Sequence, residues 1–198
     1  MRCVIVLNGE FTDNFEFLAD DHIIACDGAY EKLLSRGITP NEVLGDFDSL
    51  GYVPDGAIVY PSEKDMTDGE LALMRADELG FKSLAIICAG GGRDDHFIGN
   101  LSVLIKAFDF GFAAAMYTKR SVIYCVGHGG HRFTVSKGSI VSLFSFNSAI
   151  VTESKELKYP YHDVCLDDSS TLSVSNEAIE NEIFFYVEKG IVLLFVNL

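Results

Sequence analysis

Short apolar runs alternate with amphipathic segments through the first half of the chain. The runs are Cys3–Leu7, His22–Cys26, Val43–Leu44, Ala57–Tyr60, Leu84–Ala89 and Ala113–Tyr117. Their length and bounding turn residues favour buried β-strands. Because strand signals that alternate with helix signals are typical of a parallel sheet wrapped by helices, this half of the chain predicts an α/β domain.

Three segments between these runs carry helix signals. Thr67 and Glu70 have the spacing of a capping box, which predicts a helix from that point. Apolar residues recur on one helical face over 97–108, after two aspartates. A shorter helix is expected over 30–36, with Asp27 as a candidate for its N-terminal cap.

The pattern changes near residue 121 to runs rich in β-branched and aromatic residues. These runs are Val122–Val126, Phe133–Val135, Ile140–Phe146, Leu172–Val174, Ile183–Val187 and Ile191–Val196. Turn residues separate them and no helix signal intervenes, so we expect antiparallel strands in a β-sandwich. The sequence thus predicts an α/β domain over 1–118 and a β-sandwich over 119–198. His128 and His131 flank two glycines, which favours a hairpin turn over a metal pair.

Composition narrows the classes of partner. The 198 residues are 48% hydrophobic, enough to build a core, and no apolar run reaches the length of a membrane helix. The formal net charge is −14 without a basic cluster, which argues against a nucleic-acid partner. Five cysteines, odd in number and without a C-x-x-C pair, fit a reducing cytoplasm.

The segment Gly45-Asp46-Phe47-Asp48-Ser49 follows a predicted strand. Ligands of open α/β sheets bind at the carboxyl ends of strands. Alternate residues of an extended chain face the same way, so Asp46 and Asp48 could present two hard oxygen ligands to one Mg²⁺ ion. The simpler alternative is a solvated acidic turn.

A second acidic segment, Glu63-Lys64-Asp65-Met66-Thr67-Asp68, leads into the helix that begins near Thr67. The helix dipole alone accounts for an acidic residue such as Asp68 in the first turn. The combination suggests more, because Lys64 could meet a phosphate while Asp65 and Asp68 complete a metal site.

A glycine run, Gly90-Gly91-Gly92, joins a predicted strand to the helix that follows Arg93-Asp94-Asp95-His96. Glycines let backbone amides approach a polyphosphate, and Arg93 offers a planar fork for phosphate oxygens. The spacing matches neither a Walker loop nor G-x-G-x-x-G. A histidine in a first helical turn, here His96, is more often structural than catalytic.

Asp27 and Gly28 form a fourth loop at a predicted strand end. Convergent carboxylates, an arginine and a flexible backbone suit phosphoryl transfer, in which positioning and charge neutralisation supply most of the catalysis. No histidine is placed to activate a cysteine, so nucleophilic cysteine chemistry is disfavoured.

In the order and sequence of these motifs, the chain resembles the thiamine pyrophosphokinase family over nearly its whole length. The matching segments are Asp27-Gly28-Ala29, Gly45-Asp46-Phe47-Asp48-Ser49-Leu50, Glu63-Lys64-Asp65-Met66-Thr67-Asp68, Arg93-Asp94-Asp95-His96, Leu157-Lys158-Tyr159-Pro160 and Ser173-Val174-Ser175-Asn176. Two departures stand out: Glu156 occupies a position where the family commonly has glycine, and the chain has no tryptophan, so Tyr159 replaces the indole of animal relatives.

The resemblance implies transfer of a pyrophosphoryl group from ATP to thiamine, with Mg²⁺ or alternatively Mn²⁺, in a homodimer whose active sites are shared between subunits. By that likeness Asp46, Asp48 and Asp68 surround the metal, and Asp65, Arg93 and Asp95 support the metal and phosphates. The residues implied around ATP are Asp27, Gly28, Lys64, Gly91, Gly92, Arg93 and His96. Tyr159, Ser175 and Asn176 are implied to line the thiamine pocket.

Two rival functions stay open on the sequence. A pyrophosphokinase acting on another small alcohol, such as a hydroxymethylpterin, could use a similar acidic α/β site. A non-catalytic nucleotide or thiamine sensor could keep the β-domain without turning over ATP. The full set of aspartates together with Arg93 argues against a sensor, since ligand binding alone needs fewer carboxylates.

Overall fold

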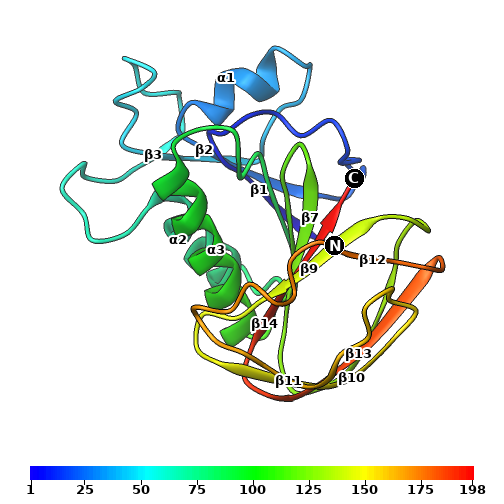
Figure 1. Cartoon of the computed structure of the whole chain (residues 1–198). Helices are drawn as coiled ribbons and strands as arrows, with labels where there is room; N and C mark the ends of the chain where they lie inside the picture. Colours follow the sequence, from blue (N-terminus) through cyan, green and yellow to red (C-terminus); the bar gives the residue numbers. More distant parts are fainter. The chain divides into compact units, whose positions relative to one another are not determined.

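The computed structural model describes residues 1–198 and contains two compact units (Figure 1). The first unit is Met1–Lys119 and the second is Arg120–Leu198. The division falls between Lys119 and Arg120, one residue after the boundary between 118 and 119 that the sequence predicts. The α/β character of the first unit and the antiparallel β character of the second confirm the predicted fold class.

Six parallel strands form the sheet of the first unit. They are β1 (Cys3–Val6), β2 (His22–Cys26), β3 (Glu42–Gly45), β4 (Ile58–Val59), β5 (Ser83–Ile87) and β6 (Ala113–Tyr117). Their spatial order is β6-β5-β1-β2-β3-β4, and every neighbouring pair is parallel. The chain therefore runs outward from β1 through β4, then returns to the other side of β1, which makes the β1–β5 boundary the topological switch point of the sheet.

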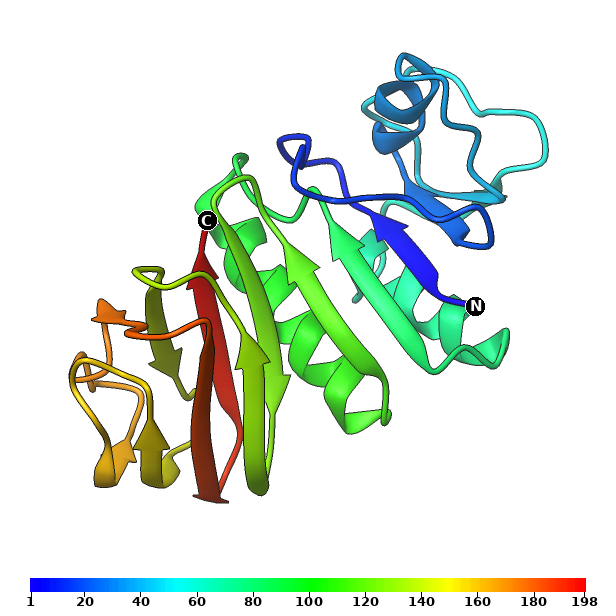
Figure 2. The same ribbon diagram turned by 90° about the vertical axis from the view of Figure 1, so that its right-hand side faces the viewer.

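Helices cover both faces of this sheet. They are α1 (Ala29–Leu34), α2 (Asp68–Glu78) and α3 (Asp94–Asp109). Helices α2 and α3 lie on one face, as Figure 2 shows. On the other face Val4 and Val6 of β1 pack with Ala29 and Leu33 of α1. No helix is both long and apolar enough to cross a membrane.

The predicted helix starts are confirmed with one change. The Thr67 side chain accepts a hydrogen bond from the Glu70 amide (3.3 Å), as a capping box requires. The cap of α1 is Gly28, which makes no side-chain bond, so Asp27 does not cap that helix. The carboxylate of Asp27 is therefore not used to cap a helix.

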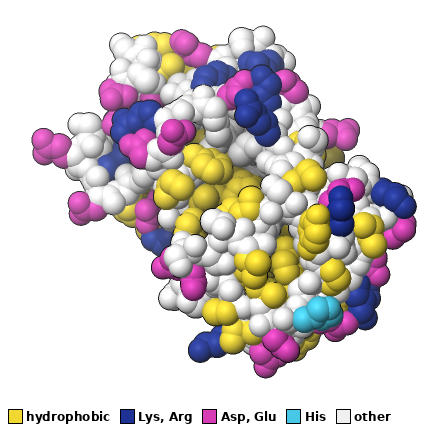
Figure 3. Space-filling view, in the orientation of Figure 1, with side chains coloured by type: hydrophobic (Ala, Val, Ile, Leu, Met, Phe, Trp, Pro, Cys, Tyr) yellow, Lys and Arg dark blue, Asp and Glu magenta, His cyan; other side chains and the backbone are white.

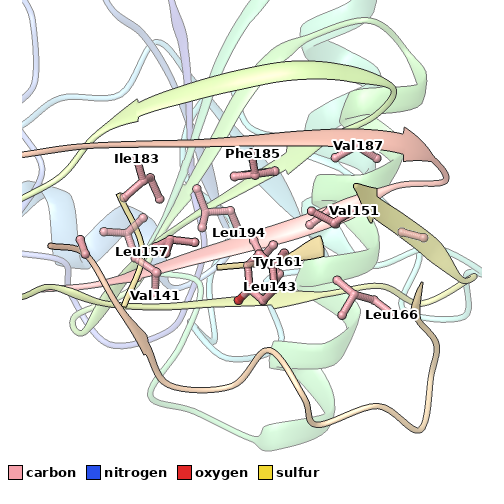
Figure 4. Packing of buried hydrophobic residues seen from close by; sticks show 14 of the residues in the cluster. Val141, Leu143, Val151, Leu157, Tyr161, Leu166, Ile183, Phe185, Val187 and Leu194 are labelled. Carbon is pink, nitrogen blue, oxygen red and sulfur yellow. The ribbon is translucent and has the colours of Figure 1, made fainter. Parts of the chain in front are cut away.

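The second unit is a sandwich of two antiparallel sheets. One has the order β12-β9-β14-β7 and the other β11-β10-β13-β8. The strands are β7 (Ser121–Val126), β8 (Gly129–Thr134), β9 (Ile140–Phe144), β10 (Ala149–Lys155), β11 (His162–Leu166), β12 (Asn176–Glu177), β13 (Glu182–Lys189) and β14 (Val192–Asn197). Buried side chains such as Leu143, Val151, Phe185 and Leu194 point toward one another between the sheets (Figure 4).

Several expectations for this unit are wrong. Leu172–Val174 forms a turn, with Leu172 70% and Val174 44% exposed, and not a strand. The stretch around His128 and His131 is not a hairpin, because β7 pairs with β14 while β8 pairs with β13 in the other sheet. Strands β10 and β11 were not expected. Register shifts in β10 near Val151 interrupt the two-residue alternation, and β11 is a largely exposed edge strand.

The two signature segments of the second unit pair with each other. Leu157 forms a bridge with Ala178, the Lys158 amide donates to the Glu177 carbonyl (2.9 Å), and Tyr159 bonds to the Asn176 side chain. Each segment has a left-handed residue: Glu156, directly before the first, has φ +61°, and Ser175, within the second, has φ +62°. Glycine adopts this conformation without the steric cost that a Cβ imposes. The position at which the family commonly has glycine is thus strained by Glu156.

We predict that Glu156→Gly stabilises the chain by about 1 kcal/mol, or ~2–4 °C in Tm. The substitution relieves the left-handed strain and also removes the buried Oε2 atom, which has no hydrogen-bond partner. Glu156→Ala is the matched control, since it removes the carboxylate but keeps the strain. Thermal unfolding of both variants tests this account. A Glu156→Gly Tm at or below that of Glu156→Ala would contradict it.

Candidate functional site

A pocket of about 640 Å³ opens within the first unit at the carboxyl edge of its sheet. Its lining comes from loops that follow β1, β2, β3, β4 and β5, and from the starts of α2 and α3. The lining residues are Leu7, Asn8, Gly9, Cys26, Asp27, Asp46, Asp48, Lys64, Thr67, Asp68, Gly69, Ala89, Gly90, Gly92, Arg93, Asp95, His96, Phe97, Gly99 and Asn100. Such an edge is where parallel sheets place ligands.

Three carboxylates converge in this pocket. One oxygen from each of Asp27, Asp46 and Asp48 lies within 4.8 Å of the others. The sequence suggested an extended chain around Phe47, but Phe47 has φ +59° and is only 3% exposed. The chain turns there, and the Asp48 amide bonds to Asp46 Oδ1 (3.3 Å). Burial of the Phe47 ring, and not strand alternation, turns both carboxylates to one side.

Asp27 is the most buried member of the cluster, with 7% of its surface exposed. Its amide donates to the Leu44 carbonyl (2.9 Å), and its Oδ2 accepts a hydrogen bond from the Ser49 hydroxyl. Its other oxygen, Oδ1, is buried without a hydrogen-bond partner. Gly45 provides the room, because a Cβ there would lie 3.2 Å from the Asp27 Cβ. A buried carboxylate oxygen without a donor is suited to a cation.

Lys64 supplies positive charge beside these carboxylates. Its Nζ lies 2.8 Å from Asp68 Oδ1 and 3.8 Å from an Asp46 oxygen. The Lys64–Asp68 contact is an ion pair whose angles fall outside hydrogen-bond geometry. Burial acts to lower the pKa of Lys64, but Asp68, Asp46 and Asp27 raise it above its ordinary value. Burial raises the pKa of Asp68, against the opposing effect of Lys64.

Arg93 lies at the exposed rim of the pocket. Its guanidinium forms a two-pronged ion pair with Asp95, with Nε–Oδ1 at 3.1 Å and Nη2–Oδ2 at 2.5 Å. This pairing lowers the pKa of the Asp95 carboxyl. His96 is exposed and its amide bonds to Asp95 Oδ1 (2.9 Å). A phosphate that binds Arg93 must therefore compete with Asp95 for the guanidinium.

Backbone strain is concentrated at this edge. Asp27, Phe47 and Cys88 have φ values of +49°, +59° and +57°, and they follow β2, β3 and β5. Non-glycine residues in the left-handed region are uncommon and cluster at functional sites. The Cys88 amide is held by the Thr12 hydroxyl (3.0 Å), so the strained turn after β5 is fixed from within the fold.

The sequence missed the turn after β1. Asn8 and Gly9 line the pocket, and the Gly9 amide donates to the Cys88 carbonyl (3.0 Å). A Cβ on Gly9 would lie 2.2 Å from that carbonyl oxygen, so only glycine permits this approach. An Asn-Gly pair directly after the first apolar run was the available signal. It carries no charge, and only the strand order reveals that this turn lies beside the loop after β5.

Most expected pocket residues of the first unit line the pocket, and three do not. Gly28 lies behind Asn8, where a Cβ would come within 2.7 Å of the Asn8 amide. Gly91 has φ +78°, and a Cβ there would lie 2.3 Å from the Glu10 Cβ. Asp65 is exposed on the loop before α2 and does not line the pocket. The two glycines therefore do not line the pocket, but they leave room for the side chains of Asn8 and Glu10.

The three expected thiamine residues lie together in the second unit. Tyr159 is 62% exposed, whereas Asn176 is 3% exposed. Asn176 Oδ1 accepts from the Tyr159 and Glu177 amides (3.0 and 2.9 Å), and Nδ2 donates to the Tyr159 carbonyl (2.7 Å). The Ser175 amide donates to the Ser142 hydroxyl (3.0 Å). Asn176 thus holds the Tyr159 backbone, and the Tyr159 ring is the exposed group.

On one face of the molecule the charged side chains do not form one acidic surface. On the face that Figure 3 shows, acidic and basic side chains are interspersed. Ion pairs such as Arg75–Glu42 (2.7 Å) and Arg132–Glu182 (2.8 Å) account for part of this pattern. The carboxylates of the pocket are therefore a local concentration of negative charge with few cations beside them.

Comparisons with known proteins bear on this site. The family model described as thiamin pyrophosphokinase, catalytic domain, matches residues 16–116. A second family model, described as thiamin pyrophosphokinase, vitamin B1 binding domain, matches residues 130–192. Together they span the pocket-lining loops after β2, β3 and β5 and the paired signature segments of the second unit.

Individual relatives agree with these matches. The chain is 32% identical to thiamine pyrophosphokinase of Bacillus subtilis over 88% of its length and 87% of that protein. The crystal structure of the Bacillus subtilis enzyme superposes with a TM-score of 0.86 at 27% identity, covering 99% of both chains. That of the Geobacillus thermodenitrificans enzyme superposes with a TM-score of 0.85 at 26% identity, covering 100% of this chain and 98% of that one.

We predict that Asp27→Asn weakens divalent-cation binding by about tenfold or more, because it removes the charge of a buried ligand oxygen. Titration with Mn²⁺, followed by electron paramagnetic resonance of the free ion, measures this directly without turnover. Asp55→Asn, in an exposed loop away from the pocket, is the control and should bind like the wild type. Equal affinities for wild type and Asp27→Asn would remove Asp27 from the metal site.

Proposed function

The chain belongs to the thiamine pyrophosphokinase family, and on that premise we propose that the pocket of the first unit transfers a pyrophosphoryl group from ATP to thiamine. The protein is accordingly an enzyme, with thiamine and ATP as its substrates and thiamine pyrophosphate and AMP as its products. The observation that carries the assignment of the site is the convergence of Asp27, Asp46 and Asp48 beside Lys64.

Asp27, Asp46 and Asp48 would hold the divalent cation, with Asp68 beside them. Hard carboxylate oxygens fit Mg²⁺, and we propose Mg²⁺ with Mn²⁺ as a substitute. When bound, the ion neutralises phosphate oxygens and orients the polyphosphate. The unpaired Oδ1 of Asp27 supports this ligand set, since no protein donor satisfies it.

The products define which bond breaks. The hydroxyl oxygen of thiamine attacks the β-phosphorus of ATP, and the bond from that phosphorus to the α,β-bridging oxygen breaks. AMP leaves with the bridging oxygen, and the hydroxyl proton is released. Lys64 and Arg93 are the cations placed to bind phosphate oxygens as charge develops. Arg93 exchanges its partner Asp95 for phosphate, whereas Lys64 stays among the carboxylates.

The decisive assay incubates the protein with ATP, Mg²⁺ and thiamine and follows AMP and thiamine pyrophosphate together. We predict equal amounts of both products from the wild type. Asp46→Asn, Asp48→Asn and Asp68→Asn should each lower kcat by about 10²-fold, because charge stabilisation in the transition state is lost. Near-normal turnover in all three variants at saturating Mg²⁺ would refute the assignment. A hydroxymethylpterin pyrophosphorylated in preference to thiamine would favour the rival substrate.

We propose that Tyr159 stacks on thiamine, while Ser175 and Asn176 shape the same region. Thiamine combines a flat aminopyrimidine with a cationic thiazolium, which suits an aromatic face. The exposed ring on a backbone clamped by Asn176 supports this assignment. Stacking with a cation–π share is worth about 0.5–2 kcal/mol.

Tyr159→Ala should raise the thiamine KM several-fold and leave the ATP KM nearly unchanged. Tyr159→Trp should retain binding, since the indole also offers a flat face. Steady-state kinetics with each substrate varied in turn checks both. If both KM values rose equally, a folding or assembly defect would be indicated, and no change in either would exclude Tyr159 from the site.

We propose further that the active site is completed in a homodimer. The loops that line the pocket belong to the first unit, and the segments that contain Tyr159, Ser175 and Asn176 belong to the second. Two-fold symmetry would therefore create two equal composite sites. Mixing Asp46→Asn with Tyr159→Ala subunits should restore activity at one intact site per heterodimer. Subunit exchange without recovered activity would mean that each site lies within one chain.

A cytoplasmic location is part of this proposal. All five cysteines are free, and four of them are buried. Burial raises the pKa of Cys3 to about 12, and it also raises the pKa of the Cys26 and Cys88 thiols. Such thiols are structural and carry no disulfide framework, as expected in a reducing compartment.

A further inference from the structure

The turn after β1 lies at the switch point of the parallel sheet. The loop after β1 and the loop after β5 border that point, because β1 lies between β2 and β5. Open α/β sheets bind ligands in the crevice outside such a point. The Leu7, Gly9 and Glu10 amides bond to the Ile87, Cys88 and Gly90 carbonyls (3.0, 3.0 and 2.7 Å), so the two loops form one rigid border.

Asn8 is the exception within this bonded turn. Neither its backbone amide nor its side-chain amide has a hydrogen-bond partner in the protein, although the residues on both sides of it do. Asn8 is exposed and lines the pocket. Its amide packs against Gly28, where a Cβ would lie 2.7 Å from Nδ2 and 2.9 Å from Oδ1. Two unused donor groups, the backbone N–H and the side-chain NH2 of Asn8, thus lie beside Asp27 at the switch point.

The carbonyls of the same turn are held by one lysine. Lys32 of α1 donates from Nζ to the Asn8 carbonyl (2.8 Å) and to the Gly9 carbonyl (2.9 Å). Lys32 is half-buried and does not line the pocket. Hydrogen bonds from an ammonium are stronger than neutral ones, so they fix the orientation of both peptide groups. These two peptide groups carry the Gly9 and Glu10 amides, so Lys32 fixes the turn that contains Asn8, whose own donors have no partner in the protein.

We propose that Asn8 binds the polyphosphate of ATP and that Lys32 is the positioning residue that orients it. Asn8 donates its backbone and side-chain N–H groups to phosphate oxygens at the switch point. Lys32 acts only through the turn, and Gly28 provides the space in which the Asn8 amide lies. The inference rests on the proposed function, because it assumes that this pocket holds the nucleotide.

Binding of α,β-methylene ATP with Mg²⁺, measured by calorimetry, tests this without turnover, since the methylene bridge replaces the bond that breaks. Asn8→Ala should weaken binding about tenfold, as expected for lost hydrogen bonds to a charged ligand. Lys32→Met should weaken it several-fold and Lys32→Arg less. Gly28→Ala should resemble Asn8→Ala, because the added Cβ displaces the flexible Asn8 amide. Lys82→Met, an exposed lysine at the opposite edge of the sheet, should bind normally.

The double variant Lys32→Met/Asn8→Ala decides whether Lys32 acts through Asn8. We expect its affinity to stay close to that of Asn8→Ala alone, whereas full additivity would overturn the positioning role. Unchanged binding by folded Asn8→Ala would overturn the whole inference. Thermal unfolding of each variant identifies loss of fold, and Lys32→Arg with a native Tm but no better binding than Lys32→Met would also count against it. Wild-type protein that binds the analogue but forms no thiamine pyrophosphate would refute the proposed function alone.

Discussion

Repulsion between carboxylates at one sheet edge is the constraint on which the site depends. Asp27, Asp46 and Asp48 present oxygens within 4.8 Å of one another, and Asp68 lies close by. Two such charges repel by about 3.5 kcal/mol at an effective dielectric constant near 20. The hydrogen bond from Ser49 to Asp27 contributes about 1.5–3 kcal/mol and cannot offset several such pairs. Lys64 offsets part of the remainder, and a divalent cation would offset more.

The backbone holds the carboxylates against this repulsion. Left-handed residues after β2, β3 and β5 turn the chain sharply at three strand ends of one sheet edge, while the sheet is packed on both faces. Burial of Phe47 and the bond from Cys88 to Thr12 fix two of these turns. Strain of this kind persists only where the surrounding fold over-determines it. The rigid sheet therefore supports a site that would not form in a flexible loop.

Much of this arrangement could be predicted from the sequence, because it follows local rules. The apolar runs gave the six parallel strands, and the capping box at Thr67 gave the start of α2. The acidic loops were found because charge after an apolar run is visible in one dimension. The left-handed turn at Phe47 was not found, because it depends on burial of a single ring. The Asn8 turn was not found either, because its place beside the loop after β5 depends on strand order.

The second unit was harder to predict for a related reason. Register shifts in β10 break the alternation of buried and exposed residues that identifies a strand. Leu172 and Val174 have the composition of a strand, yet both are exposed and lie in a turn. The role of Asn176 also needed the structure, because a buried amide that clamps the Tyr159 backbone cannot be told from a ligand-facing amide by its motif. Tertiary pairing decides these cases, and sequence spacing does not.

Thermal unfolding with and without a divalent cation tests most directly the claim that the cluster is built for a metal. Without cation, Asp46→Asn should unfold at a higher temperature than the wild type, because repulsion is relieved. Mg²⁺ at tenfold above its Kd should stabilise the wild type by about 1.4 kcal/mol, or ~3–6 °C, and the variant much less. NaCl at matched ionic strength corrects for screening. A variant that is less stable than the wild type without cation, yet gains as much from Mg²⁺, would contradict the account.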